Sequence, residues 1–197
     1  MALRELVKDT AVDIDKQIMD VNYLGPVALT KAVLEPMLVR RSGHLVVISS
    51  LSGKFGVPKL SSYSASKHAL HGFFESLRAE TSADNLKITI AVPGFIRTQI
   101  TVNALRGNGE RYGRMLSVQA KGMDPDVCAR KILKSIKQEK EEVLIGGWDA
   151  LSVTFNRFFP RIFSRIIRSH PIRRIESLKN MLSLKRSLTE AGSESRV

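Results

Sequence analysis

The spacing of apolar residues divides the chain into alternating helical and strand-like segments. The first forty residues follow a helical period, with apolar positions at Ile14, Ile18, Val21 and Leu24. Asp13 is placed to cap this helix, and Gly25-Pro26 is expected to interrupt or kink it. A second helical pattern covers residues 27–38 and stops near Ser42-Gly43.

Three short apolar runs are typical of strands. They are HLVVIS at 44–49, KITIAVPG at 87–94 and EVLIGG at 142–147. The first is expected to be buried on both faces, as in a parallel sheet. Helical patterns separate the runs, one over residues 63–83 and one that opens at Asp124-Pro125. This alternation predicts an α/β fold with a parallel sheet and helical crossovers.

Composition narrows the class of protein further. With 43% hydrophobic and 25% charged residues, the chain of 197 residues can form a cored domain, and wholesale disorder is not expected. A single cysteine, Cys128, excludes an intrachain disulfide and argues against a cysteine-rich zinc site. Residues 94–121 are polar, irregular and contain glycine, which suits a flexible flap over a site.

Basic residues gather in the last quarter of the chain. Residues 151–197 hold ten Lys or Arg against three Glu, and the whole chain has a net charge of +12. Arginines recur there at steps of three or four with apolar side chains between them, which predicts a basic amphipathic helix broken near Pro160. The segment 151–174 could contact a membrane surface, cap the substrate pocket or dock on a dimer partner. Nucleic-acid binding is not expected.

These patterns predict three regions. They are an α/β domain over 1–150, a basic helical extension over 151–186 and a disordered tail over 187–197. No run approaches the roughly 18 uncharged apolar residues that a membrane span needs. The charged N-terminus lacks the apolar core of a signal peptide. We therefore expect a soluble or peripheral protein.

The stretch SSYSASKHAL at residues 61–70 carries side chains with acid–base chemistry. Tyr63 and Lys67 lie four residues apart on a predicted helix and therefore share a face. A free phenol has a pKa of about 10, and a nearby ammonium favours the phenolate, so the pair suits general acid–base catalysis. Ser50 ends the first strand, and open α/β sheets bind ligands at the carboxyl ends of their strands. Ser50 and Tyr63 are therefore expected to meet there.

Longer motifs place this pair in a family context. VVISSLSG at 46–53, YSASK at 63–67 and VPGFIRT at 92–98 together resemble the short-chain dehydrogenase/reductase family over residues 15–147. VNYLGPVALTKAVLEPM and YSASKHALHGFFESLRAE are similar to the member 7 and 7B branch of that family. The resemblance implies the C-terminal part of a Rossmann-type, doubly wound parallel sheet.

The resemblance also implies a catalytic role for four residues. Tyr63 would exchange a proton with the alcohol or carbonyl oxygen, and Ser50 would orient that oxygen. Lys67 would lower the pKa of Tyr63 and bind the nicotinamide ribose. Asn22, in the segment DVNYLGPVALTK, would support a proton-relay water.

A nicotinamide cofactor follows from the same resemblance, with NADP(H) expected in preference to NAD(H) and no metal. Pro93-Gly94 and Thr98 match residues that line the nicotinamide amide, and Tyr63 and Lys67 are also expected to contact the cofactor. The family's Thr-Gly-x-x-x-Gly-x-Gly turn, whose amides hold the pyrophosphate, is not found in the sequence. The chain is therefore expected to be an N-terminally truncated form.

Two features imitate binding motifs without their context. Gly107, Gly109 and Gly113 in RGNGERYG follow a polar stretch rather than a buried strand, so a phosphate loop is not expected there. His68 and His71 are three residues apart on the long helix, but no third metal ligand is near in sequence. Packed or solvent-facing histidines are expected.

The function implied by the resemblance is an oxidoreductase that interconverts a carbonyl and an alcohol on a hydrophobic substrate of lipid, steroid or retinoid type. A homodimer is expected, with association to the endoplasmic reticulum or peroxisomal membrane, or alternatively a cytoplasmic location. The contrasting hypothesis is a non-catalytic short isoform that acts as an interaction or membrane-surface protein.

Overall fold

The structure is a computed structural model, and it describes residues 1–169. The chain divides into two compact units, Met1–Phe158 and Phe159–Val197. The first unit contains a parallel sheet with strand order β1-β2-β3 within the described residues. The strands are β1 (Gly43–Ile48), β2 (Leu86–Pro93) and β3 (Glu142–Ile145). The predicted parallel α/β fold is therefore confirmed, with each strand within two residues of its predicted limits.

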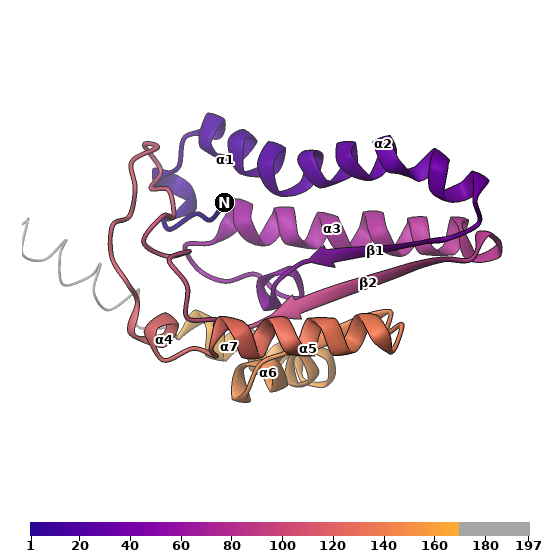
Figure 1. Ribbon diagram of the computed structural model, residues 1–197. Helices are drawn as coiled ribbons and strands as arrows, with labels where there is room; N and C mark the ends of the chain where they lie inside the picture. The colour runs from indigo at the N-terminus through magenta and orange to yellow at the C-terminus, as the bar shows by residue number, and fades with distance from the viewer. Residues whose placement is uncertain (170–197) are drawn as a thin grey trace, which may run out of the picture. The chain divides into compact units, whose positions relative to one another are not determined.

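Helices cover both faces of this sheet (Figure 1). The helices of the first unit are α1 (Val12–Met19), α2 (Gly25–Val39), α3 (Ser61–Glu80), α4 (Ser117–Ala120), α5 (Pro125–Lys137) and α6 (Trp148–Phe158). Figure 1 shows α2 and α3 on one side of the sheet and α5 on the other. The helix predicted to open at Asp124-Pro125 is α5, and Asp124 caps it by accepting a hydrogen bond from the Asp126 N–H at 2.9 Å.

Alternate residues of β2 supply the cores of the two faces. Ile88, Ile90 and Val92 pack with Leu70 and Phe74 of α3. The opposite face presents Ala91, which packs with Cys128 of α5 and Ile145 of β3. The middle strand is thus buried on both faces, as expected for a parallel sheet flanked by helices.

The prediction that the first strand is buried on both faces is wrong. Val47 of β1 is buried against α3, whereas Val46 and Ile48 on the other face are exposed. The reason lies in α5, which packs on β2 and β3 and does not extend across β1. The outer edge of β1 is also unpaired within the described part of the chain, because β1 pairs with β2 alone.

The N-terminal forty residues are less uniformly helical than predicted. Residues 1–11 are largely extended, with a short 3-10 turn at Val7–Asp9, and Leu3 forms a β-bridge with Leu105. Ala11, not Asp13, is the N-cap of α1, and Asp13 lies in its first turn, where a negative charge is favourable.

The interruption predicted at Gly25-Pro26 is present as a π-helical turn. It covers Asp20–Leu24 and joins α1 to α2, and the Gly25 N–H donates to the Asp20 carbonyl five residues back. Pro26 has no N–H and cannot donate to the carbonyl four residues before it, which accounts for the break in the α-helical ladder.

Residues 94–121 are irregular, as predicted, apart from α4. The segment is tied to the N-terminus through the bridge between Leu105 and Leu3, and Ala104 is buried beside Tyr63. Beyond α6, the chain breaks at Phe159 and continues as α7 (Pro160–Arg168), so the break predicted near Pro160 is confirmed. The predicted stretch 170–186 and the tail 187–197 lie outside the described residues. Among the residues described, no helix combines the length and apolar character of a membrane span.

Candidate active site

Ser50 lies at the carboxyl edge of the sheet, two residues after the end of β1. Its backbone is fully extended (φ −164°, ψ 161°), and its hydroxyl accepts a hydrogen bond from the Ser52 N–H at 3.2 Å. This bond caps the 3-10 turn Leu51–Gly53, so the side chain is held by the turn that follows the strand.

Tyr63 lies in the first turn of α3 and is 9% exposed. It packs with Leu3, Ile18 and Ala104, and the Ser50 side chain is close enough to its phenol to affect the phenol's pKa. Burial raises the pKa of the Tyr63 phenol above its ordinary value, and the Ser50 side chain lowers it by a smaller amount. The largest influence on the phenol therefore opposes the effect expected of Lys67.

Lys67 follows Tyr63 by one helical turn. Its ammonium donates to the Ile48 carbonyl at 2.9 Å and lies 5.8 Å from the centroid of the Tyr63 ring. Burial lowers the pKa of Lys67 from 10.5 to about 8, because removal from water penalises the charged form. A lysine so placed is still mostly protonated at neutral pH, and it holds a positive charge beside the phenol.

A pocket of about 300 Å³ opens at this edge of the sheet. Five residues expected at the site line it, namely Ser50, Tyr63, Lys67, Pro93 and Thr98. Its apolar wall includes Ile48, Ile96 and Ile100. Gln119 and Cys128 also line the pocket and were missed by sequence reasoning, because they come from α4 and α5 and carry no motif.

Asn22 is close to Tyr63 in the fold, but it does not line the pocket. It is buried in the π-helical turn, where its amide donates to the Met1 carbonyl at 2.8 Å and to the Ser66 hydroxyl at 3.1 Å. Ser66 in turn donates to the Tyr63 carbonyl at 2.8 Å. In the structure Asn22 therefore supports the first turn of α3, and its role toward a proton-relay water stays a prediction.

Gly94 does not line the pocket, and the carboxylate of Asp149 lies against it. The Asp149 carboxylate accepts hydrogen bonds from the Phe95 N–H at 2.9 Å and the Gly147 N–H at 2.7 Å. A Cβ at Gly94 would collide with this carboxylate, so the close approach requires glycine. Asp149 lies more than fifty residues from the Pro93-Gly94 turn, and no sequence signal linked the two.

The glycines of RGNGERYG have a structural explanation. A Cβ at Gly107 would overlap the backbone carbonyl of Asp9, whereas Gly109 and Gly113 have positive φ angles of 88° and 70°. These are positions that favour glycine for close approach and turn geometry. The segment gives no support to a phosphate-binding loop, in line with the sequence analysis.

Comparisons with known proteins agree with this geometry. Residues 4–108 match the family model described as short chain dehydrogenase. The chain is 47% identical over 150 residues to the dehydrogenase/reductase SDR family protein 7-like of Drosophila melanogaster, covering 76% of this chain and 46% of that protein. It is 41% identical over 170 residues to SDR family member 7B of Mus musculus, covering 86% and 53%. The chain thus spans about half the length of these curated relatives.

Solved structures show the same fold. A short-chain dehydrogenase from Streptomyces avermitilis superposes with a TM-score of 0.69 at 25% identity, over 88% of this chain and 66% of that one. A 4-hydroxyisoleucine dehydrogenase complexed with NADH and succinate gives 0.55 at 25% identity, over 75% and 64%. A short chain dehydrogenase/reductase from Burkholderia phymatum in complex with NAD matches at 0.69 and 14% identity, over 82% and 64%, which is a likeness of fold alone.

Proposed function

Because the chain belongs to the short-chain dehydrogenase/reductase family, in the branch of members 7 and 7B, we propose that it forms the catalytic part of an oxidoreductase that interconverts a carbonyl and an alcohol. The observation that carries the proposal is the convergence of Ser50, Tyr63 and Lys67 on one pocket. The three side chains come from the end of β1 and the first two turns of α3.

Each of these side chains has a defined task in the proposal. The Ser50 hydroxyl, which lines the pocket beside Tyr63, would hold the substrate oxygen in place. Tyr63 would donate its proton to that oxygen in reduction and accept it back in oxidation. A phenol whose pKa is raised by burial is protonated at neutral pH, which suits it as the acid in carbonyl reduction. The Lys67 ammonium would stabilise the phenolate as the proton leaves.

We propose that the nicotinamide part of a cofactor binds in this pocket. Lys67, Pro93 and Thr98 line the pocket and would hold its nicotinamide riboside, with Gly94 next to Pro93 outside the lining, and the bound cofactor supplies or accepts the hydride. The volume of about 300 Å³ suits a nicotinamide ring or a small substrate rather than a whole dinucleotide. The sequence contains no glycine-rich pyrophosphate turn. We propose NADP(H) as the cofactor, with NAD(H) as the alternative.

Substrate and partners follow as finer parts of the proposal. The isoleucines of the pocket wall support a hydrophobic carbonyl or alcohol as the substrate. Exposed apolar residues on α2, among them Leu29 and Val39, support a homodimer through this helix. Exposed Trp148, Leu151 and Phe158 of α6 support peripheral contact with a membrane, in keeping with a location at the endoplasmic reticulum or peroxisome.

Titration of the 197-residue chain with NADPH and then NADH tests the proposal. Nucleotide fluorescence and thermal shift should show saturable binding that is lost in Lys67→Met, because the ammonium would hold the nicotinamide ribose. Lys87→Met is the matched control, since Lys87 lies on the surface and pairs with Glu139 at 3.2 Å. Failure of a folded chain to bind either nucleotide would show that this chain does not act as an oxidoreductase by itself.

A further inference from the structure

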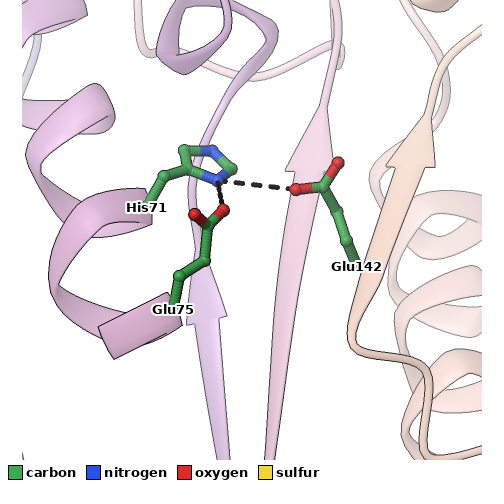
Figure 2. A group of neighbouring side chains, drawn as sticks. All are labelled: His71, Glu75 and Glu142. Carbon is green, nitrogen blue, oxygen red and sulfur yellow. Dashed lines mark ion pairs between the residues drawn. The ribbon is translucent and has the colours of Figure 1, made fainter. Parts of the chain in front are cut away.

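A second cluster of functional side chains lies on α3 beyond the pocket. His71 and Glu75 are one helical turn apart, and both face Glu142, the first residue of β3 (Figure 2). The Nδ1 atom of His71 is 3.6 Å from Glu75 Oε1 and 3.5 Å from Glu142 Oε2. One ligand atom from each of the three residues lies within 4.8 Å of the others. None of the three lines the pocket.

The buried imidazole of His71 is held in one orientation by Ser49. His71 is 6% exposed, and its Nε2 atom is 2.9 Å from the Ser49 hydroxyl. Ser49 has one hydroxyl proton, and it donates this proton to the Lys67 carbonyl at 3.3 Å. In the tautomer that fits this donation, Nε2 carries the proton shared with Ser49 and Nδ1 keeps a lone pair.

That lone pair faces two carboxylates, which repel it. Among the described residues, Nδ1 of His71 has no hydrogen-bond partner. The pKa of His71 is lowered, chiefly by burial and then by the Lys54 ammonium, whereas the Glu142 and Glu75 carboxylates raise it by smaller amounts. A lone pair and two carboxylates that converge in this way are the donor set of a cation.

The spacing of these donors matches a tetrahedral metal centre. Zinc–nitrogen and zinc–oxygen bonds of about 2.0–2.1 Å place neighbouring ligands roughly 3.4 Å apart at a tetrahedral centre. The two distances from His71 Nδ1 come within a few tenths of an ångström of that value. One imidazole and two carboxylates also neutralise the charge of a divalent ion and leave a fourth position for water.

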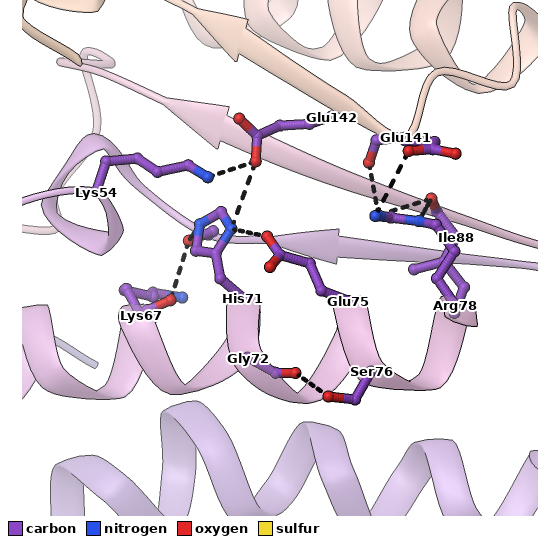
Figure 3. A network of polar contacts seen from close by, with 11 residues as sticks. Lys54, Lys67, His71, Gly72, Glu75, Ser76, Arg78, Ile88, Glu141 and Glu142 are labelled. Carbon is purple, nitrogen blue, oxygen red and sulfur yellow. Dashed lines mark hydrogen bonds and ion pairs between the residues drawn. The ribbon is translucent and has the colours of Figure 1, made fainter. Parts of the chain in front are cut away.

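We propose that His71, Glu75 and Glu142 form a binding site for Zn²⁺, although no metal was expected from the sequence. In the structure, the positive charge beside these carboxylates comes from Lys54, whose ammonium is 2.5 Å from Glu142 Oε2 (Figure 3). Its side chain is 21% exposed and ends in an ion pair rather than in the core, so the metal would displace the ammonium toward solvent. The ion would tie α3 to β3 and, through Ser49, would support the backbone carbonyl of Lys67.

Calorimetric titration of the untagged, EDTA-treated 197-residue chain with Zn²⁺ tests this site. One ion should bind per chain, and Mg²⁺ should not compete, because it prefers an all-oxygen octahedron. His71→Gln should weaken Zn²⁺ binding at least about 100-fold, because loss of even an outer-shell partner costs roughly 10–100-fold. Lys54→Met should tighten binding about fivefold, since the metal no longer has to displace an ion pair.

His68→Gln is the matched control on the same helix. His68 directs its Nδ1 atom to the Ser64 carbonyl at 2.8 Å, away from the cluster, so Zn²⁺ affinity should not change in this variant. Equal affinity in the wild type and His71→Gln would overturn the site, as would the absence of binding by a folded Lys54→Met chain. If His71→Gln does not fold, Glu142→Gln makes the same comparison with the imidazole intact.

Discussion

Helix α3 carries two pairs of side chains one turn apart, and they have different surroundings. Tyr63 and Lys67 face a pocket at the carboxyl edge of the sheet, where a ligand can reach them. His71 and Glu75 face Glu142 and Lys54, which come from β3 and the turn after β1. The same spacing on one helix thus yields an acid–base pair beside a pocket and a cluster of charges around a buried histidine.

The difference comes from what the sheet places opposite each turn of the helix. At the first turn, β1 has ended, and its last carbonyl and Ser50 are available to hold Lys67 and Tyr63. Two turns later, the helix runs back beside the strands, as Figure 1 shows, and meets the side chains of neighbouring elements. Ser49 touches both regions, because its hydroxyl contacts the Lys67 carbonyl and the His71 ring.

Replacement of Tyr63 by Phe should have the largest effect, because it should lower turnover strongly, whereas turnover does not depend directly on His71 and Glu75. Loss of the proton donor is expected to lower turnover of a carbonyl substrate by roughly 10²–10⁴-fold, the usual contribution of a positioned acid–base group. Steady-state rates with NADPH measure the effect. Tyr112→Phe is the control, because Tyr112 packs against the same small core as Tyr63 and lies outside the pocket. Equal losses in both variants would remove Tyr63 from its proposed role.

Sequence reasoning located the first pair because its partners are near it along the chain. Ser50 is thirteen residues before Tyr63, and a strand end, a turn and a helix start form a local unit whose geometry the pattern predicts. The order of helices and strands was predictable for the same reason, since periodicity and Pro or Gly stops are local signals. The π-helical turn was expected only as an unspecified break, although Pro26 marks its place.

The second pair could not be found in this way. His71 was compared with His68 because they are near in sequence, but Glu142 lies seventy-one residues further on and reaches His71 only because β3 pairs with β2. The exposed face of β1 was missed for a similar reason. An apolar run such as HLVVIS indicates a strand, but the reach of α5 across the sheet decides which faces are covered.

The two pairs should change the free energy of unfolding in different pH ranges, and the size of this effect should be intermediate. Lys67 has its pKa lowered to about 8 in the folded protein, against 10.5 in an unfolded chain. Between these values the unfolded state binds more protons, so the free energy of unfolding should rise with pH. The rise should be about 2 kcal/mol from pH 8 to pH 10. Above that, Tyr63, whose pKa is raised from 10.0, acts in the opposite direction.

Urea unfolding of the wild type and Lys67→Met at several pH values checks this expectation. The alkaline rise should be absent in Lys67→Met and retained in the surface variant Lys87→Met. His71, in the second pair, should affect stability at acidic pH. Its pKa is lowered in the folded protein, so the free energy of unfolding should rise with pH up to 6.5, the ordinary pKa of histidine. A rise that persists in Lys67→Met would mean that another group titrates there.

Removal of the Ser49 hydroxyl should have the smallest effect and tests whether the two regions are joined. Ser49→Ala leaves the buried Nε2–H of His71 without its partner, which should cost about 1 kcal/mol of unfolding free energy. Ser50→Ala is the matched neighbour. It should lower turnover, and loss of the cap on the 3-10 turn should cost about 0.5–1 kcal/mol of unfolding free energy. Urea unfolding and steady-state kinetics on both variants give the comparison. Ser49 lines the pocket, so if Ser49→Ala instead loses turnover without loss of stability, its hydroxyl acts on the pocket and the His71 cluster is independent of it.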